Sequence, residues 1–141
     1  MSHITNPSSE QAARVLALIS VANGRVKECE LNALEHLDAF TRLGVSRRRF
    51  LQLAQKGLED VGGRLCERGY LHVADLLYLD DLLGEVRSRE QRLLVCRLSA
   101  AVITADGCVT AGERAAYDHM LARWHLDTPA IAQAIRVDAL H

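Results

Sequence analysis

A repeated nine-residue segment is the feature of this sequence that most restricts its fold. Residues Ala22–Glu30 read ANGRVKECE, and residues Ala105–Glu113 read ADGCVTAGE, 83 positions later. Over 19 aligned positions, seven residues are identical. Each copy lies between an apolar stretch and an amphipathic one. Because the period is too long for a solenoid array, the repeat predicts two helical hairpins that pack about a pseudo-twofold axis.

The residue types in the repeat suit a tight turn followed by a capped helix. Gly24 and Gly107 are expected to take the left-handed conformation that ends the first helix. Thr110 and Glu113 form a T-x-x-E capping box at the start of the second helix. In the first copy the cap position is Lys27, which cannot accept a backbone N–H. That copy keeps only Glu30, whose charge favours a helix N-terminus.

Composition agrees with an all-α fold. The 141 residues are 49% apolar and 25% charged, contain only two prolines, and are rich in Leu and Ala, which are strong helix formers. A chain of this length is typical of one domain. The sequence therefore predicts a single all-α domain over residues 1–141, a bundle of about seven helices that contains the two related hairpins.

Capping residues and apolar spacing place the expected helices. They cover residues 7–22, 28–43, 46–61, 71–84, 88–105, 110–126 and 128–137. Asn6 and Pro7 suit the first start, Ser46 and Ser88 suit later starts, and Gly44 suits a helix end. Because the segment 93–105 is apolar on all sides, it is expected to be the central helix.

The second copy of the repeat also resembles the latter half of an EF-hand loop. Asp106 and Glu113 would occupy loop positions 5 and 12, but Val102 and Thr104 would stand at positions 1 and 3. Since two carboxylates are missing, a full EF-hand is excluded. Two alternatives remain at this turn: Asp106 and Glu113 hold a weakly bound divalent cation, or they serve only the turn and the helix cap.

The repeat resembles the TerB-like family, whose members carry an A-D-G-x-[apolar]-[ST]-x-x-E signature between helices. Residues Ala105–Glu113 match the signature well, whereas the first copy has Asn23 in place of the acid and Lys27 in place of Ser or Thr. The resemblance implies an all-α domain with no known catalytic centre, of the kind found in bacterial stress or tellurite resistance.

The resemblance also implies a cation site. Family members are suspected of binding divalent cations such as Ca²⁺ through the acids of the signature. In this chain, only Asp106, Glu113 and Glu30 keep an acid, so these three residues are the candidate metal ligands.

A second class of function, a small enzyme, would need a histidine or a cysteine. His36 and His119 occupy equivalent positions of the repeat, but neither has a His or carboxylate partner three or four residues away. Cys29 and Cys108 lie near helix starts, where a thiolate is favoured. Structural or buried roles are the simpler alternative for all four residues, and no catalytic sequence motif occurs.

Charge is distributed unevenly along the chain. Arg47, Arg48 and Arg49 fall in the first turn of an expected helix, where cations oppose the helix dipole. Residues 42–68 carry a net charge of +4 and residues 72–85 a net charge of −4. Three interpretations stay open: a basic patch for an anionic partner, charge matching between helices or between two copies, and a solvated face.

Partner and compartment follow from what the sequence lacks. A net charge of −1 and an aromatic content of 4% argue against nucleic-acid binding, which leaves another protein or a second copy of the chain as the partner. Because residues 1–11 are polar, no secretory signal is expected. The longest apolar stretch is too short to span a membrane. The four cysteines show no CxxC spacing, so they are expected to be reduced thiols of a cytoplasmic protein.

Overall fold

The computed structural model describes residues 7–21, 27–61, 73–105 and 111–126, and within them the chain forms helices and no strand. The helices are α1 (Pro7–Ser20), α2 (Glu28–His36), α3 (Ala39–Leu43), α4 (Arg47–Val61), α6 (Val73–Glu85), α7 (Arg89–Thr104) and α8 (Ala111–Arg123). The all-α prediction is confirmed. The expected helix over residues 128–137 lies outside the described residues.

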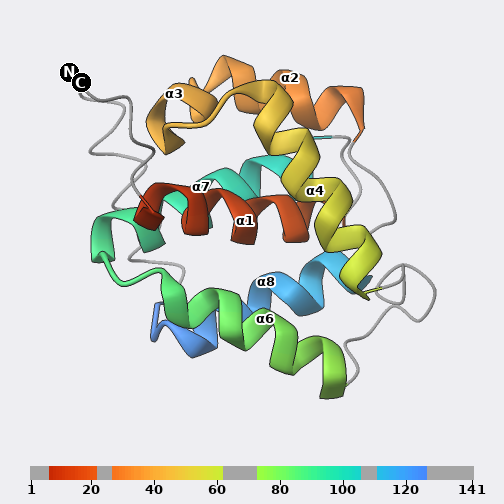
Figure 1. The fold of residues 1–141 in the computed structure, drawn as a ribbon, viewed down its shortest axis with the longest axis vertical. Coiled ribbons are helices and arrows are strands. Elements are labelled where there is room, and N and C mark those ends of the chain that lie inside the picture. Colours follow the sequence, from red (N-terminus) through yellow and green to blue (C-terminus); the bar gives the residue numbers. More distant parts are fainter. Residues whose placement is uncertain (1–6, 22–26, 62–72, 106–110, 127–141) are drawn as a thin grey trace.

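The helices form three layers (Figure 1). Helices α1 and α7 lie side by side in the middle, between α2 and α3 on one side and α6 and α8 on the other. Helix α4 runs along one face of the molecule and packs closely on α1, where a Cβ added at Gly57 would lie 3.4 Å from Leu18 Cδ1. This arrangement places the outer faces of α4 and α6 on the same side of the bundle.

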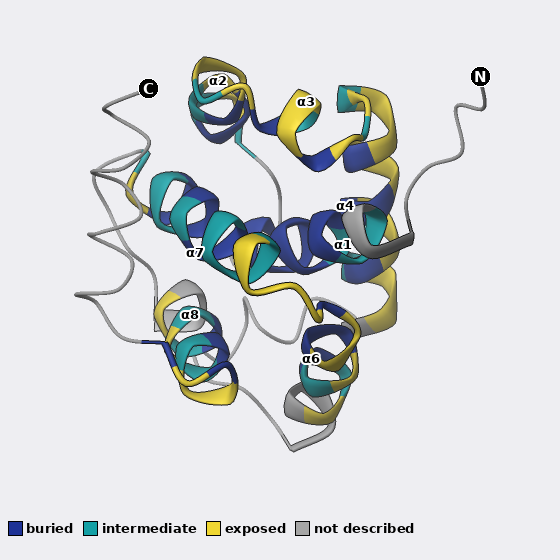
Figure 2. Ribbon diagram, turned by 90° about the vertical axis from the view of Figure 1, so that its left-hand side faces the viewer, coloured by how far each residue is buried: buried dark blue, intermediate teal, exposed yellow. Residues whose placement is uncertain are grey.

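Helix α1 forms the centre of the core. Residues 15–21 are all buried, which means that every side of this part of the helix is covered (Figure 2). Helix α7, the expected central helix, buries Val95, Leu98 and Val102 but leaves Leu93 and Leu94 only half-buried. Helix α1 is covered on more sides because it packs against α3, α4, α6, α7 and α8.

One expected helix is broken in two. The sequence predicts a continuous helix over residues 28–43, but α2 ends at His36 and α3 begins at Ala39. Between them, Asp38 takes the left-handed conformation with φ 59°, which Asp tolerates better than most residues. The break turns the chain so that Leu34 on α2 and Leu43 on α3 are both buried.

The local signals for helix ends are confirmed where the structure describes them. Gly44 has φ 71°, and the N–H of Val45 donates to the carbonyl of Phe40 in a Schellman motif. Ser46 Oγ accepts the N–H of Arg49 at 3.0 Å, and Ser88 Oγ accepts the N–H of Gln91 at 3.4 Å.

A tryptophan joins the three C-terminal helices that the structure describes. Trp124, just after α8, donates its indole N–H to the carbonyl of Leu83 on α6 at 3.0 Å. The guanidinium of Arg92 on α7 lies over the Trp124 ring at 5.6 Å and donates to the carbonyl of Val86 at 2.7 Å. These contacts join α6, α7 and the end of α8.

The helices that flank the repeat recur at the spacing of the repeat itself. Helix α2 begins at Glu28 and α8 begins at Ala111, 83 residues later. Helices α1 and α7, which precede them, are also within one residue of this spacing at both ends. The turns at residues 22–26 and 106–110 lie outside the described residues, so the pseudo-twofold relation stays a prediction. None of the described helices has the length and apolar character needed to cross a membrane.

Candidate functional site

The candidate metal ligand Glu30 is engaged by its own helix. Its side chain is 2% exposed, and Oε1 accepts the backbone N–H of Lys27 at 2.7 Å. This is the glutamate half of a capping box, and it gives the Lys27 N–H, which no carbonyl of the helix can accept, a side-chain acceptor. Glu30 therefore serves helix α2 whether or not a cation binds nearby.

The other two candidate ligands fall in the second copy of the repeat. Asp106 lies outside the described residues, as does the side chain of Glu113. The backbone of Glu113 belongs to the first turn of α8. Within the part of the chain that the structure describes, no group of three or more His, Cys, Asp or Glu side chains could hold a metal ion.

The two repeat histidines lie apart. His36 is exposed on α2, whereas α8, which carries His119, lies on the other side of the α1–α7 layer (Figures 1 and 2). His119 Nε2 lies 2.7 Å from Asp80 Oδ1 on α6, and Arg123 Nε lies 3.8 Å from the same oxygen. Local spacing missed this carboxylate because it precedes His119 by 39 residues and meets it only through helix packing.

The described cysteines differ in their surroundings. Cys96 is buried in the core, and burial raises the pKa of its thiol to about 12. A thiol with this pKa is protonated at neutral pH and is a poor nucleophile. Cys29 is half-buried near the start of α2, and Cys66 and Cys108 lie outside the described residues.

Two of the three arginines at the start of α4 are paired with other helices. Arg47 lies 2.6 Å from Glu35 and 3.7 Å from Glu28, both on α2. Arg49 lies 2.6 Å from Glu10 on α1. The basic start of α4 is therefore balanced by acids of α1 and α2, and the described contacts of these two arginines do not reach the acidic segment 72–85. Arg48 is exposed and has no partner among the described residues.

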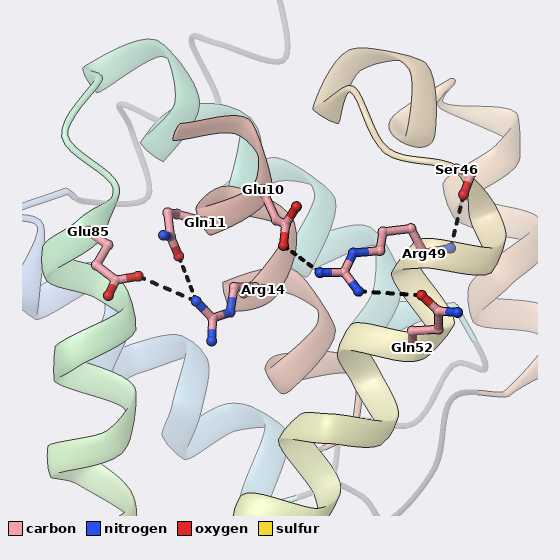
Figure 3. Close-up of polar contacts among 7 residues, drawn as sticks. All are labelled: Glu10, Gln11, Arg14, Ser46, Arg49, Gln52 and Glu85. Carbon is pink, nitrogen blue, oxygen red and sulfur yellow. Dashed lines mark hydrogen bonds and ion pairs between the residues drawn. The ribbon is translucent and has the colours of Figure 1, made fainter. Parts of the chain in front are cut away.

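A polar groove of about 210 Å³ lies where α1, α4 and α6 meet. Figure 3 shows Arg49 reaching from α4 to Glu10, and Arg14 reaching from α1 toward Glu85 on α6. Arg14 Nη1 also donates to Gln11 Oε1 at 3.1 Å. Leucines of all three helices also line the groove, together with these charged side chains. Because each arginine faces a carboxylate, the network joins the three helices and leaves little net charge for a ligand.

Tyr78 and Asp60 join α6 to α4 at this groove. The Tyr78 hydroxyl donates to Asp60 Oδ2 at 2.6 Å, and Lys56 Nζ lies 3.5 Å from Asp60 Oδ1. Burial raises the pKa of Tyr78 to about 12, and the bond to Asp60 adds to the effect. The same bond lowers the pKa of Asp60. Asp60 is therefore ionised, and Tyr78 is protonated, at neutral pH.

The outer face of α4 is open to solvent and hollowed. A shallow depression of about 730 Å³ lies against it. The described residues that line it are Arg47, Arg48, Leu51, Gln52, Gln55, Lys56 and Glu59, all on α4. Leu51 is 38% exposed, one of two large apolar side chains that the described residues leave exposed. Comparison with protein families, curated proteins and solved structures finds no match to this chain.

Proposed function

We propose that this chain is a non-enzymatic, TerB-like helical module that binds a partner protein along the outer face of α4. The observation that carries the proposal is the open depression of about 730 Å³ on this face, with the exposed Leu51 beside it. The matched spacing of the two helix pairs supports the TerB-like part. A cytoplasmic place in bacterial stress or tellurite resistance belongs to the same proposal.

The basic residues beside Leu51 indicate that the partner of this face is acidic. Arg48 and Lys56 flank Leu51 along the helix, and Arg48 has no partner among the described residues. An acidic helix that carries an exposed apolar side chain would neutralise the arginine and cover the leucine. Opposite charges at the rim raise the association rate and make binding sensitive to salt.

A peptide titration followed by nuclear magnetic resonance tests this proposal. An amphipathic helical peptide of Leu and Glu is added to the ¹⁵N-labelled chain at high dilution. We expect shifts at the amides of Arg48, Leu51 and Gln55 that weaken as salt is added, and weaker binding by Leu51→Ser. The same peptide with Lys in place of Glu is the control. Equal shifts on α7 and α8, or none, would refute the proposal.

Cation binding at the second copy of the repeat is a separate candidate. It draws support from the start of α8 at Ala111, which puts Glu113 in the first turn, close in sequence to Asp106. The capping role of Glu30 in the first copy supports the competing role for Glu113, that of a helix cap. If a cation does bind at the second copy, Asp106 and Glu113 would hold it without Glu30.

Calorimetric titration separates these two roles. The wild type and the Asp106→Ala/Glu113→Ala variant are each titrated with Ca²⁺, Mg²⁺ and Zn²⁺. A binding isotherm present only in the wild type would support the cation site. Equal heats from the two proteins would end the cation proposal and leave the protein-binding proposal untouched.

A further inference from the structure

The described residues leave two large apolar side chains exposed, one on α4 and one on α6. Leu51 on α4 is 38% exposed and Leu77 on α6 is 61% exposed. Helices α4 and α6 both face the viewer in Figure 1 and lie toward the right-hand side in Figure 2. The two helices that carry the exposed leucines therefore lie on one side of the bundle.

The charges around the two leucines are opposite. Arg48 precedes Leu51 by three residues, and Asp81 follows Leu77 by four. Both charged side chains are exposed, and neither has a partner among the described residues. Among the described acids of α6, Glu85 pairs with Arg14 and Asp80 with His119 and Arg123, which leaves Asp81 as the exposed, unpaired acid among them. At the start of α4, Arg47 and Arg49 are paired with acids of α1 and α2, which leaves Arg48.

The spacing of these residues suits two helices that pack antiparallel. With a rise of 1.5 Å per residue, Arg48 and Leu51 are about 4.5 Å apart along α4, and Asp81 and Leu77 are about 6 Å apart along α6. When α4 of one copy runs antiparallel to α6 of another, Leu51 meets Leu77 and Arg48 meets Asp81. The mismatch of about 1.5 Å is within the reach of an arginine side chain.

We propose that a second copy of this chain occupies the outer face of α4, and that it does so through Leu77 and Asp81 on its α6. This inference rests on the proposed function, because it names the partner that the α4 face binds. Each copy carries both helices on one side of the bundle, so a twofold pair can form the contact twice. The interface is small, and the pair dissociates on dilution.

Sedimentation velocity of the full chain over about a hundredfold range of concentration tests the proposal. We expect a monomer–dimer equilibrium at low ionic strength that shifts toward monomer in about 0.5 M salt. In the proposed interface, Arg48→Glu places an acid opposite Asp81 of the other copy, and Asp81→Arg places a cation opposite Arg48 of the other copy. Each variant is expected to weaken association at least about tenfold. Leu77→Ala is also expected to weaken it, and circular dichroism verifies that each variant is folded.

The double variant Arg48→Glu/Asp81→Arg gives the sharpest outcome. It restores an opposite-charge pair across the interface, and we expect association within about threefold of the wild type. Arg89→Glu, an exposed reversal on α7, is the matched control and should change nothing. A monomer under all conditions, or a double variant as weak as the single ones, would overturn the inference. The peptide titration is run on monomer, so it would still decide whether the α4 face binds an acidic partner.

Discussion

At the scale of single residues, burial and one or two hydrogen bonds decide what a polar side chain does. The side chain of Glu30 is buried and accepts the N–H of Lys27. This hydrogen bond stabilises the start of α2. Ser20 and Ser99 are both fully buried polar residues on helices. Ser20 Oγ donates to the carbonyl of Leu16 at 2.8 Å, whereas Ser99 Oγ has no partner among the described residues.

This contrast predicts different effects of the same substitution. Ser99→Ala removes an unsatisfied hydroxyl and is expected to leave stability unchanged or to raise it. Ser20→Ala removes a hydroxyl that donates a hydrogen bond. The free energy of unfolding of the Ser20→Ala protein should therefore be about 1 kcal/mol lower than that of the Ser99→Ala protein. Urea unfolding monitored by the single tryptophan measures both. The two variants are compared with each other, because both replace a fully buried serine on a helix by alanine. Equal stabilities would contradict the prediction.

Hydrogen bonding between Tyr78 and Asp60 predicts a pH effect on stability. The pKa of Asp60 is lowered in the folded chain from its ordinary value of 3.8. The ionised carboxylate therefore stabilises the fold when the pH is above 3.8, and this stabilisation is lost as the pH falls through the lowered pKa of the folded chain. Tyr78→Phe should lower the free energy of unfolding at pH 7 by about 1 kcal/mol and by less at pH 3. Urea unfolding at the two pH values measures the difference.

Tyr117→Phe is the matched control for that experiment. Burial also raises the pKa of Tyr117 to about 12, but the shift has no hydrogen bond to a carboxylate among its causes. Its effect on stability should therefore be the same at pH 3 and pH 7. An equally pH-independent loss in Tyr78→Phe would show that the bond to Asp60 contributes nothing.

At the scale of helices, the ends are set by local chemistry and the break between α2 and α3 is not. Ser46, Ser88 and Gly44 act within a few residues of themselves, and each was predictable from its neighbours. The left-handed Asp38 was not predictable, because the apolar spacing of residues 31–40 suits a continuous helix. The break is favoured by the burial of Leu34 and Leu43 against different parts of the core.

The conformation of Asp38 predicts an unusual response to glycine. Asp38→Gly should raise the free energy of unfolding by about 0.5–1 kcal/mol, because glycine takes positive φ without strain. Asp38→Ala should lower it, since a Cβ is disfavoured there. Asn32→Gly, at an exposed site inside α2, is the control and should be destabilising. Thermal unfolding by circular dichroism measures all three, and a loss of stability in Asp38→Gly would contradict the assignment.

At the scale of the whole molecule, α1 is the helix on which the others are assembled. It contacts α3, α4, α6, α7 and α8, and Leu16 at its centre is fully buried. The apolar pattern of residues 93–105 pointed to α7 as the centre. Alanine content would not have separated the two helices, because α7 also carries Ala100 and Ala101, which are only half-buried.

Truncation of Leu16 is expected to weaken the entire bundle. Leu16→Ala should lower the free energy of unfolding by about 3 kcal/mol, and the unfolding curves from tryptophan fluorescence and circular dichroism should coincide. Leu77→Ala, at a 61% exposed site, should change the stability of the monomer by less than about 0.5 kcal/mol. Separate transitions by the two probes would show that α8 unfolds independently of the rest.

Local pattern was enough for the all-α class, the capped helix starts and the spacing of the two helix pairs, because these depend on residues a few positions apart. The partners of the charged side chains depended on packing. Arg49 meets Glu10 and His119 meets Asp80 across 39 residues of sequence, and no local rule reports which distant helices will lie together. The same holds for the surface, because the exposure of Leu51 and Leu77 is decided only once α4 and α6 have packed on α1.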